Sequence, residues 1–151
     1  MSSTSSTLYI LNGPNLNLLG VREPHIYGSD TLAMIRARCE TRAKQHGLTI
    51  DFRQSNIEGE LINAVHEARE KAAAIIINPA GFSFTSVALL DALKTFDGYK
   101  IELHLTNIHR RGVIYEKSLI SLAADAVIAG LGADGYELAI DAIQRKLAVA
   151  A

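Results

Sequence analysis

The chain contains an unbroken run of six apolar residues, Ala-Ala-Ala-Ile-Ile-Ile, directly before Asn78. A strand with one face in water alternates apolar and polar side chains, whereas a strand buried on both faces is apolar throughout. The run therefore predicts a central strand of a parallel sheet that helices cover on both sides. This limits the fold to α/β architectures, in which strands and helices alternate along the chain.

Apolar segments of strand length alternate with segments of helical period over the whole chain. Strands are expected at residues 8–11, 48–52, 74–77, 101–105 and 126–128. Helices are expected at residues 32–43, 61–68, 87–96 and 138–147, with a shorter one at 116–123. We predict a flavodoxin-like three-layer α/β sandwich around a five-stranded parallel sheet of order 2-1-3-4-5, with right-handed crossovers.

The length of 151 residues fits one domain. Residues 1–7 are polar and are expected to form a disordered tail, which leaves residues 8–151 as a single flavodoxin-like catalytic domain. The tail lacks the basic start and apolar stretch of a signal peptide, and no apolar run approaches the roughly 20 residues that span a membrane. We therefore expect a cytoplasmic protein without a membrane partner.

The charge composition argues against nucleic acid as a partner. Fifteen Lys and Arg residues stand against 16 Asp and Glu residues, spread along the chain, for a net charge of -1. Cys39 is the only cysteine, so no intramolecular disulfide and no cysteine cluster for zinc is expected. Small molecules and further copies of the chain remain as partners.

In an open α/β sheet, ligands bind outside the carboxyl ends of the strands. The reactive residues that follow predicted strand ends are Asn12, Asn15, Arg22, Tyr27, Asn78 and His104. The loop at 12–30 is longer than the roughly 2 to 6 residues typical of such connections, which favours a lid or binding loop over a disordered excursion. Leu16, Leu18 and Leu19 in this loop are expected to be buried.

Two pairs of residues are candidates for acid–base chemistry. A guanidinium from Arg22 near the phenol of Tyr27 would favour the phenolate, and Tyr27 is therefore a candidate base. Glu102 and His104 lie on the same face of a predicted strand, where the carboxylate would hold the imidazolium and make His104 an acid or base. The alternatives are structural roles: core packing for Tyr27, a surface ion pair for Arg22 and a satisfied strand end for His104. His109 is a weaker candidate.

Two further patterns have simpler explanations. Ser83, Thr85 and Ser86 precede the helix expected at Val87, where they either cap it or leave its amides facing an anion. Residues 130–135 read G-x-G-x-x-G, but no second strand of a βαβ unit and no acidic residue about 20 positions on follow them. We interpret these glycines as a tight strand-to-helix turn.

Longer strings are more specific than these patterns. They are Asn12-Gly13-Pro14-Asn15-Leu16-Asn17-Leu18-Leu19-Gly20, Arg22-Glu23-Pro24-His25-Ile26-Tyr27-Gly28, Gln54-Ser55-Asn56, Thr85-Ser86-Val87-Ala88, Glu102-Leu103-His104 and Gly130-Leu131-Gly132. On these strings, the chain resembles the type II 3-dehydroquinate dehydratases from Tyr9 to about Lys146.

The resemblance implies a trans dehydration of 3-dehydroquinate to 3-dehydroshikimate through an enolate, without metal, Schiff base or cofactor. Such a reaction belongs to the shikimate pathway of aromatic amino acid biosynthesis or to quinate catabolism. By similarity, Tyr27 abstracts the proton beside the ketone and Arg22 keeps it ionised. Asn15 helps a water to stabilise the enolate, and His104 protonates the departing hydroxyl.

The resemblance also implies how the substrate, a cyclic hydroxy-keto carboxylate, is held. Asn78 and the backbone amides of Leu105 and Thr106 match positions that bind its carboxylate and tertiary hydroxyl. Asp91 matches a residue that reaches the site of a neighbouring subunit. The family assembles as a homo-dodecamer, a tetramer of trimers.

The chain departs from the family pattern at four positions. They are Phe84 and Ile57 in place of His, and Tyr115 and Leu90 in place of Arg. Phe84, Tyr115 and Arg111 are therefore expected on an altered substrate-binding side, where Arg110 or Arg111 replaces the missing cation. The alternatives are a related protein that acts on, or only binds, a similar cyclic hydroxy-keto acid, and a flavin- or nucleotide-binding module.

Overall fold

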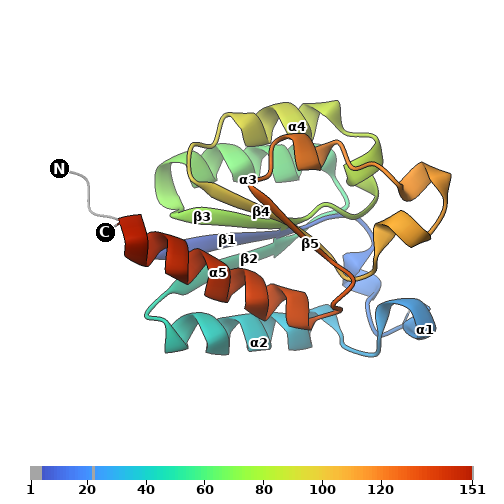
Figure 1. Cartoon of the computed structure of the whole chain (residues 1–151), viewed down its shortest axis with the longest axis horizontal. Helices are drawn as coiled ribbons and strands as arrows, with labels where there is room; N and C mark the ends of the chain where they lie inside the picture. The colour runs from blue at the N-terminus through green and yellow to red at the C-terminus, as the bar shows by residue number, and fades with distance from the viewer. Residues whose placement is uncertain (1–4, 22, 151) are drawn as a thin grey trace.

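The computed structural model describes residues 5–21 and 23–150, and for Pro24 and Tyr27 it describes the backbone alone. Five parallel strands form one sheet of order β2-β1-β3-β4-β5, with β3 in the middle (Figure 1). The strands are β1 (Thr7–Asn12), β2 (Thr49–Gln54), β3 (Ala74–Asn78), β4 (Tyr99–His104) and β5 (Ala126–Ala129). The predicted strand order is confirmed.

Helices cover both faces of the sheet, with α2 and α5 on one side and α3 and α4 on the other (Figure 1). The helices are α1 (Pro24–Tyr27), α2 (Leu32–Gln45), α3 (Glu58–Lys71), α4 (Val87–Lys94) and α5 (Asp134–Ala150). In β3, Ala74 and Ile76 join the core under the first pair, and Ile75 and Ile77 join the core under the second. The apolar run is thus explained by burial of both strand faces. None of the helices within the described ranges is long and apolar enough to cross a membrane.

Two residues of the predicted tail contact the sheet and the helices that cover it. The Ser5 hydroxyl donates to the carbonyl oxygen of Lys71 at 2.6 Å, and the carbonyl oxygen of Ser6 accepts from the Thr49 amide at 3.0 Å. Residues 1–4 of the predicted tail lie outside the described residues. The division into a tail and a catalytic domain stays a prediction.

The loop after β4 contains three single 3-10 turns and no α-helix. The short helix expected at 116–123 is therefore wrong, because only the turn η5 lies in that segment. The turns are η3 (Ile108–Arg110), η4 (Val113–Tyr115) and η5 (Ile120–Leu122). In an α-helix, the amides of Leu119 and Ile120 would bond to carbonyls four residues back. Instead, Leu119 donates to the carbonyl oxygen of Ser83 at 2.7 Å and Ile120 donates to the Ser118 hydroxyl at 3.2 Å. A serine side chain competes here with the helical pattern.

The loop after β1 folds back onto the core rather than extending from the surface. Leu16 and Leu19 are buried, but Leu18 is 44% exposed, so its predicted burial is wrong. A 3-10 turn, η1 (Leu16–Leu18), explains the difference, because successive side chains rotate by about 120° and cannot all face the core. At Gly13 the loop passes so close to β3 that an added Cβ would lie 2.3 Å from the carbonyl oxygen of Pro79.

A buried polar chain joins the ends of the two central strands. The Tyr136 hydroxyl, at the start of α5, donates to Asn12 Oδ1 at 2.6 Å and accepts from Asn78 Nδ2 at 3.1 Å. Tyr136 and Asn12 have no exposed surface, and Asn78 is 3% exposed. Burial raises the pKa of the Tyr136 phenol, so the group stays protonated and keeps its hydrogen atom for Asn12.

We predict that Tyr136→Phe lowers the free energy of unfolding by about 1 to 3 kcal/mol, because it removes the hydroxyl partner of the buried Asn12 Oδ1 and Asn78 Nδ2. Urea unfolding followed by circular dichroism measures this difference. Tyr99→Phe is the matched control, because Tyr99 is only half-buried and packs its ring against Lys146. Equal losses in the two variants would contradict the prediction.

Candidate active site

A cavity of about 190 Å³ opens at the carboxyl ends of β1, β3 and β4. Three segments line it, at and beyond the ends of these strands: Pro14, Asn15, Leu16, Leu18 and Leu19 after β1; Asn78, Ala80, Gly81 and Phe84 from β3 onward; and His104, Leu105, Thr106, Ile108, Arg111 and Tyr115 from β4 onward. The parallel sheet brings these three segments to one edge, as the topological rule predicts. Asn15, Asn78, His104, Leu105 and Thr106, all predicted from the sequence, line this one cavity.

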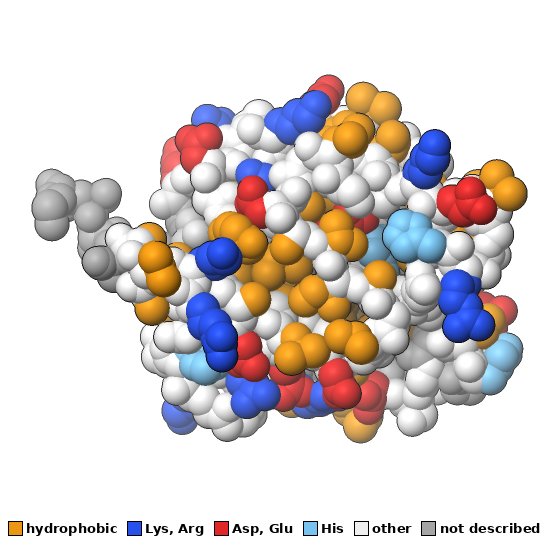
Figure 2. All heavy atoms as spheres, in the orientation of Figure 1, with side chains coloured by type: hydrophobic (Ala, Val, Ile, Leu, Met, Phe, Trp, Pro, Cys, Tyr) orange, Lys and Arg blue, Asp and Glu red, His pale blue; other side chains and the backbone are white. Residues whose placement is uncertain are grey.

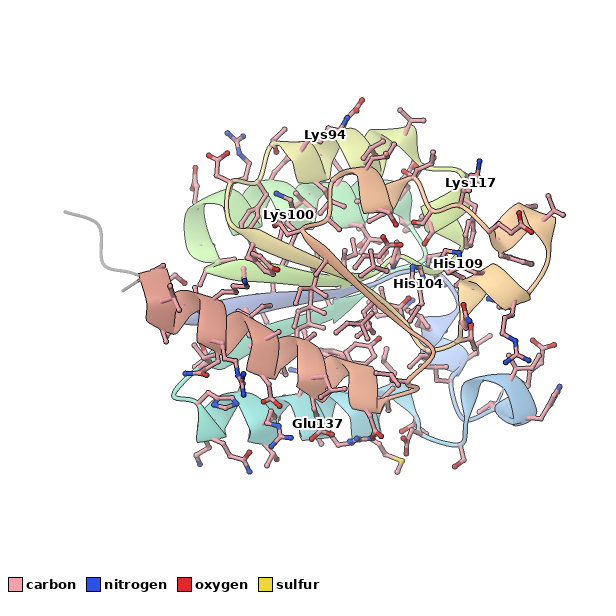
Figure 3. The ribbon with its side chains drawn as sticks, viewed as in Figure 1. Lys94, Lys100, His104, His109, Lys117 and Glu137 are labelled. Carbon is pink, nitrogen blue, oxygen red and sulfur yellow. The ribbon has the colours of Figure 1, made fainter. Side chains whose placement is uncertain are left out.

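His104 is a polar residue of the cavity lining, and the buried Glu102 lies behind it. Residues two apart on a strand share a face, and His104 Nε2 lies 2.5 Å from Glu102 Oε2. Glu102 has no exposed surface and His104 is 4% exposed. Figure 3 shows His104 at the end of β4, next to the loop that carries His109. The ring of His109, the weaker candidate, is exposed and holds the carbonyl oxygen of Glu116 through Nδ1 at 2.7 Å.

Glu102 keeps its negative charge in this buried position. Burial alone would raise the pKa of its carboxyl group, but hydrogen bonds from His104, Ser118 and Ser121 outweigh burial and lower that pKa. The Ser121 hydroxyl donates to Glu102 Oε1 at 2.5 Å, on the side away from His104. The arrangement is a carboxylate that orients an imidazole toward a cavity, which suits proton transfer.

Two asparagines of the cavity wall are held in place by hydrogen bonds. Asn15 has a left-handed conformation, with φ 69°, and its amide donates to Asn56 Oδ1 at 2.9 Å. Asn78 Oδ1 accepts from the Ala80 amide at 3.3 Å while Nδ2 donates to Tyr136. A carboxamide carries two N–H donors. The side chains of Asn15 and Asn78 can therefore each donate at least one hydrogen bond to a ligand.

Two aromatic residues also line the cavity. Phe84 and Tyr115 meet edge to face, with ring centroids 5.2 Å apart and planes at 80°. The guanidinium carbon of Arg111 lies 4.4 Å from the centre of the Tyr115 ring. Arg111 lines the cavity, whereas Arg110 is exposed and does not. Of the two arginines proposed from the sequence, Arg111 therefore has the position to meet a ligand.

The described structure places one further predicted site residue away from the cavity and leaves the side chains of two others undescribed. Arg22 lies outside the described residues. Tyr27 ends helix α1 in the loop after β1, and only its backbone is described. Asp91 is exposed on α4 and does not line the cavity of its own chain.

The glycine and serine patterns have structural explanations. The amides of Gly130 and Gly132 donate to the carbonyl oxygens of His104 at 3.3 Å and Leu105 at 2.9 Å, which fits a tight turn. The Ser86 hydroxyl caps α4 by accepting from the Leu89 amide at 2.9 Å. Within the described ranges, no group of three or more His, Cys, Asp and Glu side chains is placed to hold a metal ion.

Sequence reasoning missed the residues that support the site from distant segments. Tyr136, Ser118 and Ser121 were not identified, and Asn56 entered only as part of the string Gln54-Ser55-Asn56. A tyrosine in the first turn of an otherwise apolar helix face is a signal for a buried hydroxyl that needs partners. The two serines follow a loop without periodicity, and no local pattern marks them.

Comparisons with known proteins agree with this geometry. A family model described as dehydroquinase class II matches residues 6–144. The chain is 55% identical over 140 residues to the 3-dehydroquinate dehydratase of Streptomyces avermitilis, which covers 92% of this chain and 88% of the relative. It is 56% identical over 135 residues to that of Caulobacter vibrioides, covering 89% of this chain and 92% of the relative.

Solved structures are similar over nearly the whole chain. The type II dehydroquinase from Propionibacterium acnes has a TM-score of 0.90 and 37% identity, covering 95% of this chain and 99% of its own. A 3-dehydroquinate dehydratase-like protein from Bifidobacterium longum has a TM-score of 0.71 and 30% identity, covering 94% and 98%.

Proposed function

The chain belongs to the class II dehydroquinase family and removes water from 3-dehydroquinate, and we propose that it does so without a cofactor. The proposed reaction is a trans elimination that passes through an enolate and yields 3-dehydroshikimate. The observation that carries this proposal is the buried Glu102–His104 pair, of which His104 lines the cavity. It supplies an acid for a departing hydroxyl at the edge of the sheet where ligands bind.

His104 is the proposed acid. Its Nε2 is occupied by the Glu102 carboxylate, which leaves Nδ1 as the ring nitrogen for the substrate. The buried carboxylate behind the ring fixes the orientation of the imidazole toward the cavity. The proton passes to the leaving hydroxyl, which departs as water.

Tyr27 is the proposed base, acting as a phenolate on the proton beside the ketone. Its support is the family resemblance and its place in α1, within the same loop whose residues 14–19 line the cavity. Arg22, by its positive charge, would keep the phenolate ionised. Asn15 would hold a water against the enolate oxygen, where stabilisation matters most because negative charge develops there.

The remaining polar wall is proposed to hold the substrate carboxylate and tertiary hydroxyl. Asn78 and the backbone amides of Leu105 and Thr106 border the cavity beside His104, which supports this role. Arg111 is the proposed cation of the cavity lining, and Tyr115 and Phe84 brace it. A cation–π contact fixes a guanidinium at little entropic cost, because the ring restricts its motion before the ligand arrives.

A homo-dodecamer, a tetramer of trimers, is the proposed assembly, in which Asp91 reaches the site of a neighbouring subunit. Its exposure on α4 supports this role. Figure 2 shows apolar side chains gathered across the face formed by β5 and α5, with charged side chains around them. Val127, Leu131 and Leu138 are between 45% and 52% exposed there, as expected of a surface that other subunits cover. A cytoplasmic role in the shikimate pathway or quinate catabolism follows from the same proposal.

The proposed function predicts that the purified protein generates an ultraviolet-absorbing conjugated enone from 3-dehydroquinate. The product is conjugated because elimination places a double bond beside the ketone, whereas the substrate has none. Absorbance is followed at several enzyme concentrations, and the rate should scale with them. No absorbance change at high enzyme concentration would overturn the function.

Tyr27→Phe is expected to lower kcat by about 100-fold to 10,000-fold, because it removes the proposed general base. The free energy of unfolding should stay within about 0.5 kcal/mol, because the substitution removes one hydroxyl group and keeps the ring. Steady-state kinetics and urea unfolding measure the two effects. A variant with normal kcat would refute the base assignment.

Arg111→Ala is expected to raise KM about tenfold or more, since a hydrogen bond to a charged group contributes about 1.5 to 3 kcal/mol. Arg110→Ala is the matched control, because it removes the same charge from an exposed neighbour outside the cavity. Steady-state kinetics compare both variants at several ionic strengths. The assignment fails when the two variants raise KM equally.

A further inference from the structure

Two serines beyond the cavity wall lie against the far side of Glu102. Ser121, in η5, donates to Oε1 at 2.5 Å, whereas His104 occupies Oε2. Ser118 donates to the same carboxylate. The segment that carries both serines is anchored to the loop after β3, because the Leu119 amide donates to the carbonyl oxygen of Ser83 at 2.7 Å.

We propose that Ser118 and Ser121 are positioning residues of the reaction, which hold Glu102 as a carboxylate aimed at His104 and set the lowest pH at which the pair works. They touch neither the cavity nor the proposed substrate, so they act through Glu102. The kinetic part of the proposal rests on the proposed role of His104 as the acid. The predicted change in the titration of the Glu102 carboxylate does not rest on that role.

The reason is the cost of a buried charge. A carboxylate out of water is unfavourable unless hydrogen-bond donors replace the water that it has lost. His104 supplies a donor to one oxygen, and the serines supply the donors to the rest of the group. Without the serines, burial would favour the protonated carboxyl group, which no longer holds an imidazolium.

Few other groups compete for control of this charge. His104 is the titratable neighbour on β4 itself, and the flanking strands place the uncharged Ile77 and Val127 beside Glu102. From the loop after β4, Arg111 and Tyr115 face the same cavity as His104. The serines are therefore the groups to change.

The direction of the pH effect follows from the lowered pKa of Glu102. A donor that stabilises the carboxylate lowers its pKa, so loss of that donor raises it. The carboxylate then takes up a proton at a higher pH than in the wild type. Activity that needs the carboxylate is accordingly lost earlier as the pH falls.

The test compares wild type with the double variant Ser118→Ala, Ser121→Ala and with Ser121→Ala alone. Carbon-13 NMR of labelled glutamate carboxyl groups, with Glu102→Gln to assign the signal, follows the titration of Glu102 without substrate. We expect its midpoint to move to higher pH in both variants. The acid limb of the kcat profile should move in the same direction, with kcat about tenfold lower at neutral pH, as expected for one lost hydrogen bond to a charged group.

Two further variants separate positioning from general damage. Ser121→Thr keeps the hydroxyl and should restore the midpoint and the acid limb. Ser83→Ala removes a buried hydroxyl that has no hydrogen-bond partner within the described part of the chain and whose backbone holds the same segment, so it should shift neither. An unchanged Glu102 titration in the double variant would overturn the proposal. If the wild type fails to dehydrate 3-dehydroquinate, the proposed function falls while the NMR result still decides the role of the serines.

Discussion

The Glu102 carboxylate is a full charge without exposure to water, and this constraint organises the end of the molecule where the cavity lies. Such a charge is tolerated only when donors reach both of its oxygens. One donor, His104, lies on the same strand and requires only strand alternation. The other side needs Ser121, which follows 19 residues later in η5, so the loop after β4 must return to the sheet. The loop that supplies this donor also carries Arg111 and Tyr115, which line the cavity.

The strand ends are held by a second set of buried polar groups. Asn12 and Asn78 are register partners on adjacent strands, and Tyr136 joins them from a position 124 residues away from Asn12. Because the tyrosine comes from α5, the last helix fixes the edge on which the first and third strands place their loops. Gly13 allows those loops to touch, since a larger residue would collide with Pro79. Fold and site are therefore stabilised by the same contacts.

The sequence predicts the features that follow from local patterns, such as apolar runs and the alternation of side chains along a strand. The apolar run before Asn78 determines the central strand, and the two-residue spacing of Glu102 and His104 predicts their contact. It does not predict contacts that join distant segments, such as Tyr136 to Asn12 or Ser121 to Glu102, because no local pattern encodes them. The expected helix at 116–123 fails for the same reason: its amides bond outside the segment and to Ser118. The role of Tyr27 as the base stays a prediction from the sequence, based on its position near Arg22 and on the family resemblance.

Different contacts hold His104 and the aromatic residues of the cavity lining. This difference affects how substrate specificity can change within the fold. The Glu102–His104 pair is held by a hydrogen bond to a buried carboxylate. Almost any substitution in this pair leaves a buried polar group without a partner. The wall of Phe84, Tyr115 and Arg111 is held by ring and cation–π contacts, which tolerate exchange because they bury no unpaired polar atom. Substrate contacts on the wall can therefore vary while the elimination chemistry stays. The limit on this freedom is the segment itself, since the loop that presents Tyr115 also carries the serines that hold Glu102.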